Sequence, residues 1–281
     1  MEERALVEQL RGALLGRYEV RRTEKQKAAF ISWACAYAED LGASVAVEES
    51  SGVLRSRNIV FGDVDKARTI ITAHYDTCAW MPTGAFTTPG CWPLLLLTEL
   101  MQVILLLPIL LIMFFGVSNP HTANDNTSGV LLVLLLMARL KDKPGVAFVL
   151  FDNEETGLWG SQAFIKAHPQ ASGRFLVNLD CVGDGDTLLY TGMPRGLRMP
   201  QAARLQKAME TAAPKHGMKT AGGAFPRWLY PSDQMLFPRG TALAALKGRK
   251  LLYLNRIHTP RDTVLDERNI LCLAEIIEQA V

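Results

Sequence analysis

The sequence contains polar segments that follow apolar runs and carry the residue types that bind metal ions. The first is AHYDT, in which His74 and Asp76 stand two residues apart. Positions i and i+2 of an extended chain point to the same side. The Asp76 carboxylate can therefore fix the tautomer of the His74 imidazole while that imidazole binds a metal. On its own, an H-x-D pair would indicate no more than an ordinary surface pair.

Carboxylates stand at the ends of three further segments. In NDNTSGV, Asp125 precedes an apolar helical pattern, where polar side chains can cap the helix and a carboxylate can bridge two metals. In LFDNEETGLWGS, the adjacent Glu154 and Glu155 diverge, so that one can bind a metal while the other faces the water to be activated. In VNLDCVGD, Asp180 follows the run FLVNL, where an unpaired carboxylate is costly to bury.

A second candidate imidazole, His258, lies in NRIHTPRDT. The two imidazoles and three carboxylates form a mixed nitrogen and oxygen set without thiolate, which suits Zn²⁺, with Mn²⁺ or Co²⁺ as alternatives. The cysteines are scattered and odd in number, and they include no C-x-x-C pair: Cys35, Cys78, Cys91, Cys181 and Cys272. They predict neither a thiolate zinc site nor a disulfide framework.

The elements that must position these residues alternate between strand and helix patterns. Residues 1–40 are helical in pattern, and the strand patterns are ASVAVEE, RNIVF, ARTIITAHYD, VAFVLFDNEE, RFLVNLDCVGD, TLLYTG and LLYLNRIHT. Helical patterns cover Ser128–Leu140, Gly160–His168, Gln201–Ala213 and Leu265–Val281. We therefore expect an α/β fold with a mostly parallel mixed sheet sandwiched between helices. Ligands of such sheets bind at the carboxyl ends of the strands, where most of the polar residues above stand.

Composition limits the possible classes of protein. The chain has 281 residues, 49% hydrophobic and 21% charged, which favours one folded domain over residues 1–281 and excludes a disordered chain. A net charge of +2 gives no reason to expect a nucleic-acid partner. The locally basic segment RYEVRRTEKQK predicts a solvated helix face, with contact to a membrane surface as the alternative. The first 20 residues lack the basic-then-apolar order of a signal peptide, so we expect a cytoplasmic protein.

Six motifs in order resemble those of the co-catalytic zinc aminopeptidases, metallopeptidase family 28, whose relatives include glutamate carboxypeptidase and glutaminyl cyclase. They are AHYDT, NDNTSGV, EETGLWGS, NLDCVGD, SDQMLF and IHTPRDT, within roughly Arg57–Val281. The resemblance implies a zinc-exopeptidase fold and two zinc ions. It implies that one ion is held by His74 and Asp180, the other by Glu155 and His258, with Asp125 bridging both.

The resemblance also implies roles for residues that bind no metal. Glu154 would be the general base, and Asp76 would orient His74. Ser232 and Asp233 match the motif that lines the substrate side, whereas Gln234 stands where many relatives carry histidine, which leaves the substrate specificity open.

The activity that follows from the resemblance is that of a metal-dependent exopeptidase. The expected reaction is an aminopeptidase's hydrolysis of the N-terminal bond of a peptide or aminoacyl substrate. The alternatives are a glutaminyl-cyclase-like acyltransferase, which in those relatives uses a single zinc, and a non-catalytic, membrane-associated scaffold.

Residues 77–120 interrupt the catalytic pattern with a hydrophobic insertion. Between Trp92 and Gly116 the only charged residue is Glu99. Both ends must meet at the metal site, so we expect a helical hairpin, bent at Pro108, that turns back on itself. Lipid, another subunit or the domain itself can cover its apolar side chains. We expect it to dip into a membrane from the cytoplasmic side, or to mediate self-association, through Trp92, Leu106, Pro108 and Phe114.

Overall fold

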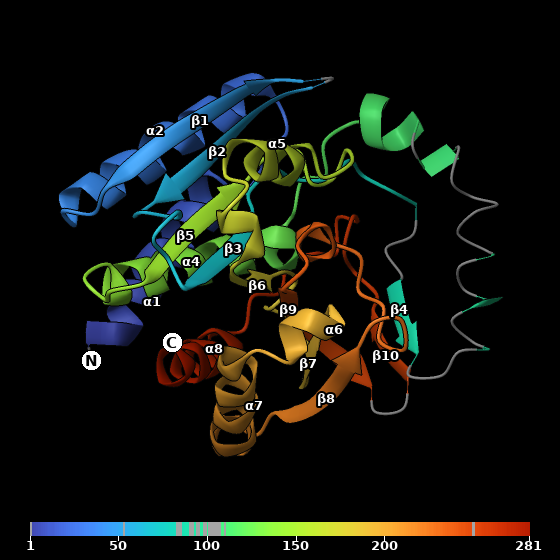
Figure 1. Ribbon diagram of the computed structural model, residues 1–281. Coiled ribbons are helices and arrows are strands. Elements are labelled where there is room, and N and C mark those ends of the chain that lie inside the picture. The colour runs from blue at the N-terminus through green and yellow to red at the C-terminus, as the bar shows by residue number, and fades with distance from the viewer. Residues whose placement is uncertain are drawn as a thin grey trace.

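The computed structural model describes residues 2–52, 54–82, 86–89, 93, 96–97, 100, 108–109, 111–248 and 251–281. In this part of the chain, ten strands form one mixed sheet, shown in Figure 1. The order along its main path is β1-β2-β5-β3-β6-β9-β10-β4, and β7 pairs with both β9 and β8. The strands are β1 (Val45–Ser51), β2 (Arg55–Phe61), β3 (Thr69–His74), β4 (Phe86–Pro89), β5 (Val146–Phe151), β6 (Phe175–Leu179), β7 (Thr187–Gly192), β8 (Lys219–Ala224), β9 (Gly240–Gly248) and β10 (Leu251–Leu254).

The centre of the sheet is parallel and its flanks are antiparallel. Strands β5, β3, β6 and β9 run parallel to one another, and β7 is parallel to β8. The other pairings, including β1 with β2 and β10 with β4, are antiparallel. All residues of β3 and β6 are buried, as their nearly continuous apolar sequences require when helices cover both faces. The expected α/β class is thus confirmed.

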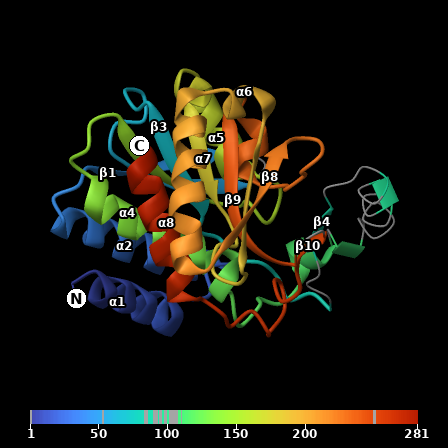
Figure 2. The same cartoon turned by 90° about the horizontal axis from the view of Figure 1, so that it is seen from below.

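Helices cover the sheet on two sides (Figures 1 and 2). The larger core cluster joins one face of the sheet to α1, α2, α4, α7 and α8. A smaller cluster on the opposite face includes Phe164 of α5. The longer helices are α1 (Glu2–Arg17), α2 (Glu24–Asp40), α4 (Gly129–Leu140), α5 (Trp159–Ala167), α7 (Pro200–Ala212) and α8 (Glu267–Ala280); α6 (Pro194–Leu197) is a single turn.

Helix α4 follows an irregular turn, η1 (Ala123–Ser128), and lies in the middle of the larger core cluster. Its sequence GVLLVLLLMARL is apolar on nearly every side, which is typical of a helix surrounded by other elements. Asn126 Oδ1 accepts the Gly129 N–H at 3.1 Å and so caps the first turn. A side chain at Gly129 would bring a Cβ within 2.4 Å of Asn126 Oδ1 and the Leu179 carbonyl oxygen, so the close packing requires glycine there.

The hydrophobic insertion leaves and re-enters the domain at one place. Ala79 forms an antiparallel bridge with Ser118, and the Trp80 N–H donates to the Val117 carbonyl at 2.9 Å. Residues 111–115 are helical, and Arg22 Nη2 holds the end of this segment by donating to the Met113 carbonyl at 2.7 Å.

The expectation of a membrane-associated location is wrong. Within the described ranges, no helix combines the length and the apolar character needed to cross a bilayer. Trp92 and Leu106 lie outside the described residues. Pro108 and Phe114 are described and exposed, Phe114 to 42%. Self-association through residues 92–116 stays a prediction.

Candidate metal centre

Three parallel strands deliver donor side chains to one edge of the sheet. His74 is the last residue of β3, Asp180 follows β6, and Glu155 lies in the loop after β5. Asp125 lies in the turn before α4, and His258 lies between β10 and α8. All of these residues except His258 are at least nine-tenths buried. The five residues that the sequence pattern assigns to metal binding therefore meet at one place.

The donor atoms form two adjoining groups that share one carboxylate. In the first group, His74 Nε2 lies 3.4 Å from Asp125 Oδ1 and 3.8 Å from Asp180 Oδ1. In the second, His258 Nε2 lies 2.9 Å from Asp125 Oδ2 and 3.3 Å from Glu155 Oε2. The two oxygens of Asp125 thus face two different imidazoles, and this arrangement suits a carboxylate that bridges two ions.

The donor set fits zinc. Nitrogen and oxygen ligands at 2.0–2.2 Å from a tetrahedral zinc ion stand roughly 3.3–3.6 Å apart, which is close to the spacing of these donors. Glu155 Oε1 is buried and has no hydrogen-bond partner within the part of the chain that the structure describes. An orphaned carboxylate oxygen is costly to bury, so the site provides negative charge that a cation would neutralise.

The pKa values of the site reflect crowded buried charges. Burial raises the pKa of Glu155 to about 8, although the nearby His258 opposes the shift. Burial lowers the pKa of His258, but Glu155 and Asp125 outweigh it and raise that pKa to about 9. Burial likewise lowers the pKa of His74, and the charge of Glu154 and the contacts with Asp125 reverse the shift and raise it well above normal. The raised pKa values of both imidazoles reflect the negative charge gathered around them, which a bound cation would also neutralise.

The Asp76 carboxylate accepts its hydrogen bonds mainly from the loop after β5. Its Oδ1 accepts the Glu154 N–H at 3.0 Å, and its Oδ2 accepts the Glu155 N–H at 3.2 Å. Its carboxylate is 3.6 Å from His74 Nδ1, whereas its own backbone carbonyl is closer to that nitrogen, at 3.2 Å. The residue that the sequence assigns to orienting His74 thus also fixes the two glutamates.

The motif SDQMLF divides between the site and the core. Ser232 Oγ and Gln234 Oε1 both accept hydrogen bonds from Asn178 Nδ2, at 3.0 and 3.1 Å. Asp233 is fully buried, and burial raises its pKa to about 7. Its charge acts on Glu154, whose own pKa burial raises well above the ordinary value. Of this motif, Asp233 is therefore the residue coupled to the metal centre.

Sequence reasoning missed Asp262, which holds the turn that carries Asp125. Its carboxylate accepts the Asn124 N–H at 2.8 Å and the Asp125 N–H at 3.0 Å. Burial, followed by the charge of Asp125, raises the pKa of Asp262 to about 8. The sequence does contain a signal for Asp262, because the motif IHTPRDT places this acid four residues after His258.

The basic segment over residues 17–27 is only partly solvated: Arg17 and Lys25 are exposed as expected, whereas Arg21 is buried. Arg21 is fully buried, and its backbone N–H donates to Thr77 Oγ1 at 3.0 Å, while its Nε donates to the Tyr75 carbonyl at 2.5 Å. Its Nη2 donates to Thr127 Oγ1 at 3.0 Å. Burial lowers the pKa of Arg21 to about 10. Arg21 thus ties the chain after β3 to the turn before α4, the two segments that carry His74 and Asp125.

A cleft of about 480 Å³ opens beside the metal centre. Glu155 and Thr156 line its inner side, and Arg22, Met113 and Phe114 line the side formed by the end of the insertion. The cleft therefore reaches one donor residue, Glu155, and has a partly apolar wall.

Comparisons with known proteins agree with this geometry. The model of a family described as peptidase family M28 matches residues 59–278. The structure is similar to a leucine aminopeptidase precursor from Bacteroides thetaiotaomicron, with a TM-score of 0.66 and 16% identity over 99% of this chain and 95% of that chain. It is also similar to a Zn-dependent exopeptidase from Parabacteroides distasonis, with a TM-score of 0.65 and 15% identity over 98% and 94% of the two chains.

A glutaminyl cyclase from Porphyromonas gingivalis is equally similar, with a TM-score of 0.66 and 16% identity over 98% of this chain and 94% of that chain. At such identities the likeness is one of fold. A search of curated proteins gave no match.

Proposed function

The chain belongs to peptidase family M28, and from this premise we propose that it is a di-zinc aminopeptidase. The observation that carries the proposal is the position of Asp125, whose two oxygens face His74 at 3.4 Å and His258 at 2.9 Å. A carboxylate shared between two donor groups is what a two-ion site requires.

The donor residues divide into two sets on this proposal. His74 and Asp180 would hold one ion, Glu155 and His258 the other, and Asp125 would contact both. When bound, the ions supply Lewis acidity that polarises the scissile carbonyl and acidifies the attacking water. Asp76 and Asp262 keep the donors in place through backbone N–H groups. Such outer partners fix the orientation of metal ligands.

Glu154 would act as the general base of the reaction. It lies next to Glu155, and burial together with the charge of Asp233 raises its pKa well above the ordinary value, while His74 opposes the shift. A carboxylate with a raised pKa accepts a proton from water more readily and can return it to the leaving amine. The cleft lined by Met113 and Phe114 would receive the side chains of a peptide or aminoacyl substrate.

Metal removal and reloading test the proposal. Chelation should abolish the hydrolysis of aminoacyl substrates, and Zn²⁺ should restore it as about two ions bind per chain. Full hydrolysis by rigorously metal-free protein would refute the proposal.

Two neighbouring variants separate the roles of the glutamates. Glu154→Gln should keep both ions and lose about 10²–10⁴-fold in turnover, since it removes the base and keeps the shape. Glu155→Gln should release one ion. Equal loss of metal in both variants would contradict the assignment.

The similarity to glutaminyl cyclases makes one alternative specific. A cyclase would release ammonia from a peptide with N-terminal glutamine and leave other aminoacyl substrates intact. Ammonia release from such a peptide, with one zinc ion per chain and no aminopeptidase activity, would replace the proposed function by this one.

A further inference from the structure

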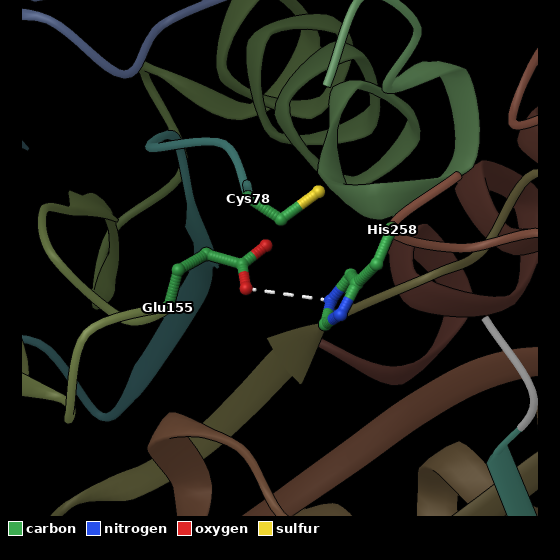
Figure 3. Close-up of side chains that lie close together, drawn as sticks. All are labelled: Cys78, Glu155 and His258. Carbon is green, nitrogen blue, oxygen red and sulfur yellow. Dashed lines mark ion pairs between the residues drawn. The ribbon is translucent and has the colours of Figure 1, made fainter. Parts of the chain in front are cut away.

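Cys78 lies beside the donor group of Glu155 and His258, and no role above uses it. The residue is fully buried. One donor atom from each of these three residues lies within 4.8 Å of the other two. Figure 3 shows the sulfur, the carboxylate and the imidazole facing a common space from three segments of the chain.

The backbone holds the sulfur in this position. The Asn119 N–H donates to the Cys78 carbonyl at 3.2 Å, and the Trp80 N–H donates to the Val117 carbonyl at 2.9 Å. Residues 74, 76 and 78 of the sequence alternate along the chain that leaves β3, and this spacing places their side chains on a common side of an extended segment. The Cys78 side chain therefore faces the site as a consequence of the same alternation that places His74 there.

A second observation points to a cation in this group of donors. Glu155 is 5% exposed, and its Oε1 is buried without a hydrogen-bond partner among the described residues. Its other oxygen faces His258 Nε2 at 3.3 Å. An orphaned oxygen of this kind needs an explanation, and a bound ion supplies one.

We propose that Cys78 Sγ is a thiolate ligand of the ion held by Glu155, His258 and Asp125. The identity of the other donors rests on the proposed function, while the cysteine is a separate assignment. Thiolate, imidazole and carboxylate together form a donor set that zinc accepts. The thiolate makes this group softer than the group of His74, Asp125 and Asp180, which contains no sulfur.

The extra ligand would make the two ions unequal. Four protein ligands fill a tetrahedral zinc site, as in structural sites, whereas three leave one position for water or substrate. The ion near His74 would then carry the open position. The ion near Cys78 would be retained longest during chelation.

Cobalt spectroscopy of the full chain tests the assignment. Chelator-treated protein is reloaded with Co²⁺, and its absorption is recorded as ions bind. A sulfur-to-cobalt charge-transfer band in the near ultraviolet is expected in the wild-type protein. Cys78→Ser should lose this band and keep the visible d–d bands of the bound ions.

Cys181→Ser is the matched control, because Cys181 is also buried and directly follows Asp180. It should keep the band. Competition with a chromophoric chelator should show that Cys78→Ser binds one of its ions at least about 10-fold more weakly, a loss that even outer partners of a metal ligand can cause.

Absence of the charge-transfer band in the wild-type protein would overturn the assignment, and this result does not depend on the folding of any variant. Persistence of the band in Cys78→Ser would also overturn it. If wild-type protein binds two ions and hydrolyses aminoacyl substrates without the band, only the cysteine assignment fails. If the band is present with one ion per chain and no hydrolysis, the cysteine assignment stands and the proposed function fails.

Discussion

Replacing Lys27 by methionine should destabilise the protein, because it leaves the buried carboxylate of Asp152 without its partner. Lys27 Nζ lies 2.6 Å from Asp152 Oδ1, and the two side chains are 5% and 1% exposed. The same ammonium donates to Asn153 Oδ1 at 2.5 Å. Methionine keeps most of the side-chain volume and removes both contacts. Asp152 Oδ2 keeps the hydrogen bond that it accepts from the Arg57 N–H at 3.0 Å.

The expected cost follows from these contacts. Removing one partner of a buried ion pair costs about 3–5 kcal/mol, and the remaining hydrogen bond to Asp152 favours the lower end. A loss of about 3 kcal/mol corresponds to a fall in Tm of roughly 6–12 °C for a domain of this size. Lys25→Met, on the exposed side of the same helix, is the control and should change Tm little.

The destabilisation should depend on pH in a defined direction. Burial raises the pKa of Asp152 in the folded protein even though Lys27 opposes the shift. Without Lys27 this pKa rises further. A carboxyl whose folded pKa exceeds its unfolded value costs no stability below the unfolded pKa, about 3.9, and costs progressively more as the pH rises toward the folded value.

Thermal unfolding of wild-type protein and Lys27→Met at about pH 5 and pH 8 measures this effect. The difference in Tm should be larger at pH 8. Adding Asp152→Asn to Lys27→Met should recover most of the loss, because it removes the charge and keeps an acceptor for the Arg57 N–H. An equal loss at both pH values, or a fall in Tm of less than about 2 °C, would refute the reasoning.

Three further predictions test single features. Asp262→Asn, measured by metal competition, should weaken metal binding about 10–100-fold, because an amide cannot accept both N–H groups that position Asp125. Burial lowers the pKa of His168 in the folded protein, but Glu48 and Asp65 outweigh burial and raise it. His168→Gln should therefore lower stability below pH 6.5 and have little effect above the raised folded pKa. Denaturant unfolding at two pH values checks this, and an equal effect at both values would exclude it. Gly160→Ala should lower Tm, because its Cβ would lie 2.2 Å from the Asp152 carbonyl oxygen, whereas Gly173→Ala has nothing within 4 Å and should not.

The elements that the sequence predicts well are those with a single strong pattern. The apolar run that ends at His74 forms β3, and the expected helix over Ser128–Leu140 is α4. The central strand β9 (Gly240–Gly248) was missed, because its sequence GTALAALKG is rich in alanine, which has little preference for strands. Its burial between β6 and β7, rather than its own composition, makes it a strand.

The membrane expectation failed for a different reason. It depended on the apolar composition of the insertion and on the requirement that both of its ends meet at the metal site, and hydropathy does not record where the chain places a segment. The pairing of Ala79 with Ser118 brings the two ends together as expected, whereas the contact of Arg22 with the end of the insertion is a long-range interaction that no local pattern contains.

The same limit explains why the acids that the sequence marks as ligands are easier to find than those that position them. Asp76 and Asp262 each accept two backbone N–H groups from segments that carry Glu155 and Asp125, and Asp152 accepts one from Arg57. The H-x-D spacing marks Asp76, but in the sequence Asp262 and Asp152 are indistinguishable from Asp125 and Asp180, because all four stand near the ends of apolar runs. What separates the two kinds is whether a carboxylate meets N–H groups of a neighbouring loop or the imidazole of another donor. Only the packing of the loops decides that, so a sequence can locate a metal centre more readily than it can assign each acid within it.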